Sequence, residues 1–330
     1  MNPHFYGKQT MALNAELMAF LDLVEDGRDA GRPPMHEQSV EQARAEFERS
    51  SRELGWNVAG QVAVSEHSFT ARDGASVAAR LYLPANAPDQ RQPWPVLVYY
   101  HGGGFVVGSL DSHDQVCREF CWRTPCAVLA IGYRLAPEYP FPTAVNDAED
   151  ALRWLWEQAT ALSLDRQRVA LGGDSAGATL ATVAAIKAAQ GELSVRPLLQ
   201  MLFYPVTDAA GSTVSSDLFD QGYLLETPTL AWFYDHYLPD EQQRCDWRAS
   251  PLRATVSTAM ASAYIAVAGF DPLLDEGRAY AEHLRAAGVD VTLHCQADLT
   301  HDFLRMASIT SAALPLYETF TAVLAQALNP

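Results

Sequence analysis

The sequence has no uninterrupted apolar run of about 18 residues, and its N-terminal segment lacks the apolar h-region of a signal peptide. We therefore expect a cytoplasmic protein that does not bind a membrane. Its five cysteines lie at irregular spacing and do not form the dense disulfide framework of a small secreted domain. Basic residues are also scarce, with 23 Lys and Arg against 40 Asp and Glu, a formal net charge of −17. Such a surface repels polyphosphates, which argues against nucleic acid as a partner.

The 330 residues are 48% hydrophobic and 19% charged, as in a packed globular protein. Eight short β-rich runs occur, at 62–70, 77–83, 96–100, 127–131, 168–172, 198–204, 262–268 and 289–296. Helical stretches separate the later runs, at 112–123, 143–160, 175–190, 274–287 and 309–327. This rhythm predicts an α/β fold whose mainly parallel, eight-stranded sheet has helices on both faces.

Two segments break the rhythm. Residues 11–25 and 37–54 predict amphipathic helices before the first strand, and Asp26-Gly27 is expected to close the first one. The interval 206–253 has helical signals and many large rings but no strand, so we expect it to pack with the N-terminal helices as a cap. The predicted organisation is 1–55 for the N-terminal part of the cap, 56–205 for the first part of the core, 206–253 for the cap insertion and 254–330 for the second part of the core.

The segment Gly173-Asp174-Ser175-Ala176-Gly177 follows an apolar run and opens a helical one, the strand, turn and helix of a nucleophile elbow. The turn is tight, so both glycines are needed. The free N–H groups at the start of the helix would face a developing negative charge. The alternative is a glycine-rich turn with an idle serine.

The segment His101-Gly102-Gly103-Gly104 comes directly after the run 96–100, where an oxyanion loop is expected in chain order. Three glycines allow the backbone to present N–H groups to an oxyanion. A purely structural glycine turn would look the same, and the presence of the elbow favours the functional interpretation.

A serine nucleophile needs a base, and the base works best when a carboxylate orients it. Elbow hydrolases supply serine, acid and histidine in that order, from loops after strands. Asp271 follows the run 262–268, and His301 follows the run 289–296. The alternatives are less well placed: His294 lies within the last predicted strand, His283 lies in a helix, and Asp275 begins that helix, where it could cap it or pair with Arg278.

From about residue 60 to its end the sequence resembles the bacterial hormone-sensitive lipase family of esterases, family IV, within the α/β-hydrolase fold. The resemblance is carried by the motifs H-G-G-G at 101–104, Y-R-L-A-P-E at 133–138, G-D-S-A-G at 173–177, D-P-L-x-D-E-G at 271–277 and H-x-F at 301–303. It implies Ser175 as nucleophile, His301 as base and Asp271 as acid. It further implies Gly103, Gly104 and Ala176 as oxyanion donors, and the N-terminal helices and the insertion as the cap.

Two family features need separate comment. Asp302 stands where the family commonly has glycine, and aspartate tolerates a left-handed backbone, so we expect the loop beside His301 to keep its shape. The stretch from Tyr133 to Glu138 has no step in the reaction. We expect it to buttress the site, with Arg134 and Glu138 anchoring neighbouring loops.

The expected function is a serine carboxylesterase that hydrolyses short-to-medium-chain acyl esters through a covalent acyl-enzyme, with no metal or organic cofactor. Substrate contacts are expected from Phe105, Tyr204, Phe219, Trp232 and Phe303. An amidase or lactonase with the same triad stays open. A ligand-binding relative without turnover is disfavoured because His301 is present. The resemblance also implies a possible homodimer through the edge of the last strand, about 289–296, and the alternation of Val289, Val291 and Leu293 is compatible with an edge.

His113, Cys117 and Cys121 lie at i, i+4 and i+8 on one predicted helix and carry metal-ligating groups. Eight residues of helix rise by about 12 Å, too far for all three to bind one ion. We therefore expect the cysteines to be buried against the sheet, with no metal site.

Overall fold

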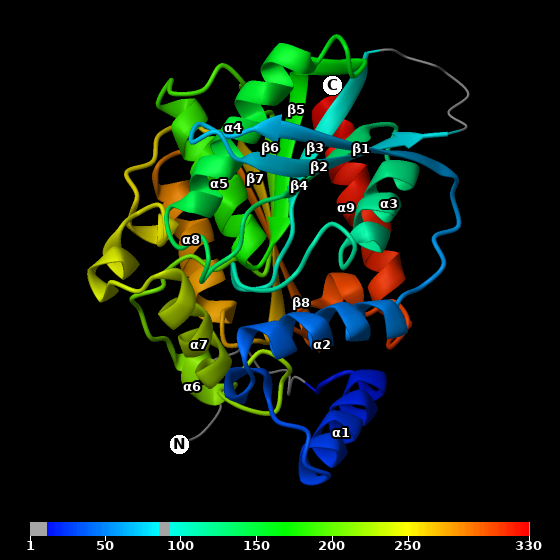
Figure 1. Ribbon diagram of the computed structural model, residues 1–330, viewed down its shortest axis with the longest axis vertical. Coiled ribbons are helices and arrows are strands. Elements are labelled where there is room, and N and C mark those ends of the chain that lie inside the picture. The colour runs from blue at the N-terminus through cyan, green and yellow to red at the C-terminus, as the bar shows by residue number, and fades with distance from the viewer. Residues whose placement is uncertain (1–11, 86–92, 330) are drawn as a thin grey trace.

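The computed structural model describes residues 12–85 and 93–329 and is built around one eight-stranded sheet in the order β1-β2-β4-β3-β5-β6-β7-β8 (Figure 1). The strands are β1 (Val62–Thr70), β2 (Ser76–Pro84), β3 (Trp94–Tyr100), β4 (Ala127–Gly132), β5 (Leu164–Asp174), β6 (Leu199–Phe203), β7 (Ser262–Phe270) and β8 (Val291–Thr300). β2 is antiparallel to β1 and β4, and all other neighbouring pairs are parallel. The predicted mainly parallel sheet is confirmed, with strand ends shifted by a few residues.

Helices cover both faces of the sheet (Figure 1). α4 (Thr143–Gln158), α5 (Ala176–Ala189) and α8 (Leu274–Ala286) contribute to one buried apolar cluster, and α3 (Asp114–Arg123) and α9 (Ala313–Leu328) contribute to the other. Every residue of β3 is buried, because the strand lies between these two layers. None of the helices in the described part of the chain is long and apolar enough to cross a bilayer.

Four helices lie together at one end of the sheet, towards the bottom of Figure 1. α1 (Ala15–Asp29) and α2 (Val40–Glu53) precede the sheet, and α6 (Val214–Leu218) and α7 (Thr227–Tyr237) come from the interval between β6 and β7. Short 3-10 turns, η1 (Met35–Glu37), η2 (Glu241–Cys245), η3 (Pro251–Arg253) and η4 (Phe303–Arg305), complete the connections. We call the four helices with η1 and η2 the cap. Residues 1–11 of the predicted N-terminal cap segment lie outside the described residues.

Local sequence signals set where the first cap helices begin. The Oδ1 of Asn14 accepts hydrogen bonds from the backbone N–H groups of the first turn of α1, and Ser39 and Gln42 form a capping box at α2. The predicted end of the first helix at Asp26-Gly27 is wrong, because α1 continues through Gly27 to Asp29. An interior glycine lowers the stability of a helix by only about 1 kcal/mol. The residues after Gly27 include Arg28, which forms an ion pair with Glu226.

Polar contacts join the two halves of the cap. The Nη1 of Arg28 on α1 lies 2.7 Å from Oε1 of the buried Glu226, the residue that precedes α7. Between η1 and α7, the Nδ1 of His36 lies 3.0 Å from Oγ1 of Thr229. These two contacts join the N-terminal helices to the insertion, across 198 and 193 residues of sequence.

Arg44 on α2 binds the cap to the core. Its guanidinium donates to the backbone oxygens of Val106 and Ala136, each at 2.8 Å, and to both carboxylate oxygens of Glu138. Glu138 thus anchors a neighbouring element, as expected from its motif.

The cap is also bound to the C-terminal part of the chain. The backbone N–H of Asn14 donates to the Asp298 oxygen at 2.9 Å, and the Ser308 hydroxyl donates to the Leu54 oxygen at 2.5 Å. Arg305 donates to the Ser51 hydroxyl. The C-terminal end of α2 and the start of α1 are therefore held by residues from β8 and the segment that follows it.

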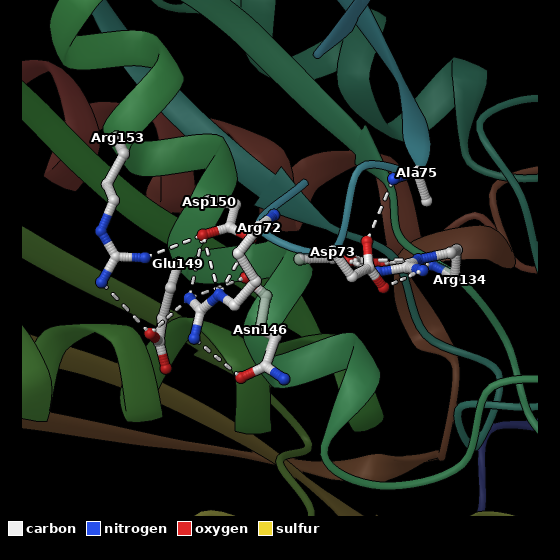
Figure 2. A network of polar contacts seen from close by, with 9 residues as sticks. Arg72, Asp73, Ala75, Arg134, Asn146, Glu149, Asp150 and Arg153 are labelled. Atoms are coloured by element: carbon white, nitrogen blue, oxygen red, sulfur yellow. Dashed lines mark hydrogen bonds and ion pairs between the residues drawn. The ribbon is translucent and has the colours of Figure 1, made fainter. Parts of the chain in front are cut away.

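A polar network fixes the turn between β1 and β2 on the side of α4 (Figure 2). The backbone N–H and the guanidinium of Arg72 both donate to the carboxylate of Asp150, and the guanidinium also reaches Glu149 at 2.8 Å. Arg134 contacts Asp73 of the same turn at 2.7 Å and Asp147 of α4 at 2.7 Å. The predicted anchoring role of Arg134 is confirmed.

Candidate active site

Ser175 lies at the turn between β5, which ends at Asp174, and α5, which begins at Ala176. Its backbone has φ 53° and ψ −120°, a strained conformation for a residue with a side chain. A Cβ on Gly177 would collide with the backbone oxygen of Tyr100, so the turn can approach β3 only with glycine at this position. The predicted nucleophile elbow is confirmed as a structural element.

The loops after β7 and β8 bring Asp271 and His301 together. The Nδ1 of His301 donates to Oδ2 of Asp271 at 2.8 Å, and Oδ1 of Asp271 accepts the backbone N–H of Leu273 at 2.9 Å. Asp271 is fully buried, and His301 and Ser175 are 7% and 8% exposed. With Nδ1 engaged, Nε2 is the ring nitrogen that remains for the hydroxyl of Ser175, which lines the same cavity as His301.

Opposing effects act on the basicity of His301. Burial of the ring lowers its pKa, but the Asp271 carboxylate, through its charge and its hydrogen bond, raises it more, and Asp302 adds to the rise. The pKa of His301 therefore lies above the usual value of 6.5. A more basic imidazole is better able to take the proton of a serine hydroxyl.

Asp302 adopts a left-handed backbone conformation, with φ 69° and ψ 16°. Its carboxylate accepts a hydrogen bond from Nη1 of Arg305 at 2.8 Å. The expectation that aspartate would be tolerated here is confirmed.

The alternative acid and bases are engaged elsewhere. Asp275 accepts the backbone N–H of Ser215 at 2.9 Å, and Nε2 of His283 lies 2.9 Å from the Ala254 oxygen. The Nδ1 of His294 lies 3.0 Å from the hydroxyl of Tyr264. Asp271 is thus the carboxylate that contacts His301.

The loop after β3 forms the wall opposite His301. The oxygen of Gly103 accepts hydrogen bonds from the N–H groups of Val106 and Val107, at 3.0 and 2.9 Å. Within residues 12–85 and 93–329, no group accepts a hydrogen bond from the N–H of Gly103, Gly104 or Ala176. Gly103 and Gly104 line the cavity that contains Ser175. These three donors are therefore free to bind an oxyanion.

His101 supports this loop from behind. Its Nδ1 donates to the Gly102 oxygen at 2.7 Å, and its ring stacks on Tyr133 at 4.4 Å between centroids. The Tyr133 hydroxyl donates to the His101 oxygen at 2.7 Å. Burial, together with the nearby His113, lowers the pKa of His101 to about 3, so the ring is neutral.

The cavity over Ser175 has a volume of about 150 Å³. Its apolar wall comes from the cap, through Met35 and Phe47 of the N-terminal part and Leu224, Leu225 and Phe233 of the insertion. Phe233 lies directly on the oxyanion loop, because a Cβ on Gly104 would fall inside its ring. Sequence reasoning missed these residues, although Phe47 and Phe233 lay in segments already expected to form the cap.

The five aromatic residues expected to contact substrate are not among the residues that line this cavity. Two of them belong to the cap and pack within or beneath it: Phe219 lies 5.6 Å from the ring of Phe270, and Trp232 lies 4.6 Å from the ring of His236. Trp232 neighbours Phe233 on α7, and the helix turns the two side chains in different directions.

The other three aromatic residues, Phe105, Tyr204 and Phe303, are buried and pack against neighbouring rings. Phe105 stacks on Tyr237 at 3.9 Å. Tyr204 packs against the rings of His301 and Phe303, at 4.5 and 4.8 Å. Their rings hold the loop residues in place and are themselves buried.

Cys117 and Cys121 are buried, as expected. His113 precedes α3, and its Nε2 faces Asp174 at 3.3 Å. In the described part of the chain, no group of three or more metal-ligating side chains is arranged to hold an ion.

Comparison with known proteins agrees with this arrangement. A family model described as alpha/beta hydrolase fold matches residues 97–305. An ethyl acetate hydrolase from Pseudomonas putida is 48% identical over 305 residues, covering 92% of this chain and 95% of the relative. A carboxylesterase from Mycobacterium tuberculosis is 36% identical over 255 residues, covering 76% of this chain and 78% of the relative.

Solved structures show the same similarity. An α/β hydrolase from the metagenome of Lake Arreo, Spain, has a TM-score of 0.92 at 33% identity and covers 98% of this chain and 100% of its own. A thermostable esterase from Pseudomonas putida has a TM-score of 0.90 at 31% identity, covering 98% of this chain and 99% of its own. The chain therefore belongs to the alpha/beta hydrolase-fold family and, within it, to the bacterial hormone-sensitive lipase group of carboxylic ester hydrolases.

Proposed function

We propose that this protein hydrolyses short-chain carboxylic esters through a Ser175–His301–Asp271 triad. The observation that carries the proposal is the 2.8 Å hydrogen bond between His301 and the buried Asp271, in a cavity shared with the strained Ser175. Asp271 holds the imidazole in one tautomer and orientation, and His301 takes the proton of the Ser175 hydroxyl as it attacks the ester carbonyl.

The reaction then proceeds in two halves. The N–H groups of Gly103, Gly104 and Ala176 stabilise the oxyanion of the tetrahedral intermediate, each worth a factor of about 10² to 10³ in rate. His301 returns its proton to the leaving alcohol, which leaves an acyl group on Ser175. Water, deprotonated by His301, attacks this acyl-enzyme, the bond between the acyl carbon and Oγ of Ser175 breaks, and His301 returns the proton to Oγ as the acid is released.

The size of the cavity supports a short acyl group. A volume of about 150 Å³, lined by Phe47, Phe233 and three aliphatic side chains, favours a short chain over a long one. The relative named ethyl acetate hydrolase acts, by its name, on an ester of two-carbon groups, which agrees with this size.

The direct test is the hydrolysis of a 4-nitrophenyl ester series from acetate to laurate by the wild type and by Ser175→Ala. We expect turnover to be highest with the short esters and to fall by about 10⁶-fold or to background in the variant, because the nucleophile is lost. Ser163→Ala, which changes a serine outside the cavity, is the matched control and should retain activity.

Intact turnover by a folded Ser175→Ala variant would exclude this mechanism. If the wild type is folded but inactive on every ester, the same triad should be tested on amides and lactones, and the ester proposal is then wrong.

A further inference from the structure

Asp174, the residue before the nucleophile, belongs to a second acid–histidine pair that the triad does not use. Its Oδ1 accepts the backbone N–H of Gly102 at 3.0 Å and the hydroxyl of Tyr99 at 2.7 Å. Its Oδ2 lies 3.3 Å from Nε2 of His113. Asp174 and His113 also line the cavity over Ser175. The pair therefore lies at the reacting centre and not in a remote part of the core.

The carboxylate of Asp174 is ionised although it is buried. Burial raises its pKa, but His113, by its charge and its hydrogen bond, and the Tyr99 hydroxyl outweigh this effect, and Arg305 contributes from further away. The pKa of Asp174 is lowered to about 2. Both members of the pair are only 2% exposed, so water stabilises neither.

His113 is not placed to act as a second base. Its Nε2 faces Asp174, and its Nδ1 lies 2.9 Å from the hydroxyl oxygen of Ser112. Both ring nitrogens are therefore engaged, and neither is left for the proton of Ser175 or of a water molecule. The pair must therefore act by holding neighbouring groups in position or by changing the electrostatic potential around Ser175.

Asp174 connects the two halves of the oxyanion hole. Its backbone leads directly into Ser175 and Ala176, and its side chain holds the N–H of Gly102, one residue before Gly103. A Cβ on Gly102 would collide with Oδ2 of Asp174, so the loop and the carboxylate are in direct contact. A shift of one donor by about 1 Å can cost a factor of about 10² in rate.

We propose that Asp174 and His113 are positioning residues that hold the oxyanion loop against the nucleophile elbow. This inference rests on the proposed ester hydrolysis. An ionised carboxylate binds the Gly102 N–H about twice as strongly as a neutral acceptor would. The contact between Nε2 of His113 and Oδ2 fixes the orientation of the carboxylate, so that Oδ1 stays on the Gly102 N–H.

The main test is Asp174→Asn, which keeps the size and one acceptor oxygen of the side chain but removes its charge. We expect kcat on 4-nitrophenyl acetate to fall by about 10- to 100-fold with KM nearly unchanged, because the loss is confined to the transition state. His113→Leu should act in the same direction. His113→Gln, which keeps a donor near the position of Nε2, should recover part of the loss.

The matched control is Asp150→Asn in the network of Figure 2. Asp150 is also buried and also accepts a backbone N–H and side-chain donors, but it lies outside the active-site cavity. We expect this variant to lower the melting temperature about as much as Asp174→Asn and to leave kcat unchanged.

A second readout does not depend on turnover. A small alkylboronic acid forms a tetrahedral adduct with an active serine, and calorimetry gives its affinity. Asp174→Asn and His113→Leu should weaken boronate binding by about tenfold or more, whereas Asp150→Asn should not. Wild-type kcat and boronate affinity in a folded Asp174→Asn, or equal losses in His113→Leu and His113→Gln, would overturn the inference while leaving the proposed function intact. An inactive wild type would instead overturn the proposed function.

Discussion

Burial and the neighbouring Asp271 carboxylate have opposite effects on the pKa of His301. The carboxylate prevails and raises the pKa of His301 above 6.5. The ring must be neutral to accept the serine proton, so we expect kcat/KM to rise with pH and its acid limb to have a midpoint above 6.5. The measurement is a pH–rate profile on an uncharged ester.

Asp271→Asn should move that midpoint down and lower kcat by about 10³- to 10⁴-fold, because the orienting charge is lost. Asp275→Asn is the control, since the carboxylate of Asp275 accepts the backbone N–H of Ser215, and its profile should match the wild type. A wild-type midpoint at or below 6.5 would contradict the prediction.

Glu276 illustrates the opposite case, a buried acid that resists ionisation. Burial raises its pKa to about 8, even though the N–H groups of Thr207 and Asp208 stabilise its charge. The unfolded chain loses this proton near 4.5 and the folded chain only near 8, so folding stability falls as pH rises between these values.

Glu276→Gln removes this titration and keeps an acceptor for Thr207. We expect its melting temperature, relative to the wild type, to be higher near pH 8 than near pH 5. Glu282→Gln, an exposed position on the same helix, is the control and should show no such change. If the melting temperatures of Glu276→Gln and the wild type differ by the same amount at both pH values, the prediction is wrong.

The sharp turn at Ser175, the pairing of Asp271 with His301 and the left-handed backbone of Asp302 could be predicted because each depends on short motifs and on the order of strands. The directions of the five aromatic rings could not, because the direction of a side chain depends on the backbone around it. Phe105 and Tyr204 have positive φ values, 64° and 37°, which no sequence pattern indicated. Their rings pack beneath the loops that hold the site.

Among the elements, α7 has the most direct influence on substrate size. It carries Phe233 over Gly104 and places Trp232 away from the cavity. Phe233→Ala should enlarge the cavity and raise the ratio of kcat/KM for octanoate over acetate by about tenfold or more, since each buried methylene is worth about 1 kcal/mol. The ester series described above measures this ratio.

Trp232→Ala is the matched control on the same helix, and it should lower stability without changing the ratio. An unchanged ratio in a folded Phe233→Ala variant would show that another element limits chain length.

The sequence predicted whether a segment is a helix or a strand more reliably than it predicted the residues at which the segment begins and ends. Strong periodicity and β-rich runs indicated each strand and each core helix, whereas the end of α1 depended on a contact that no local pattern shows. Arg28 lies past Gly27, and its partner Glu226 is almost 200 residues away. A tertiary ion pair of this kind decides whether the last turn of a helix forms.

At the scale of the whole molecule, β8 is an edge of the sheet, with Thr292 and His294 exposed along it. An unpaired edge strand can add a strand from a second copy, so we expect a homodimer through β8. Size-exclusion chromatography with light scattering should give twice the mass of one 36.2 kDa chain.

The double variant Thr292→Lys and His294→Lys should give the mass of a single chain and keep its activity, because lysines on an edge strand oppose pairing. Asp290→Lys, just before the strand, serves as a charge-matched comparison. A wild type that elutes as a monomer at all concentrations would contradict the proposed interface.

The contacts between the two ends of the chain have a consequence for biosynthesis. α1 and α2 leave the ribosome before the sheet, but their partners Asp298, Arg305 and Ser308 lie in or after its last strand, β8. His301 lies in the same late segment. The contacts at the start of α1 and at the end of α2 therefore form only after β8 has been made, whereas Arg44 can bind the core earlier. A chain interrupted before residue 298 would lack these contacts and His301, so we expect unfinished copies not to hydrolyse an ester.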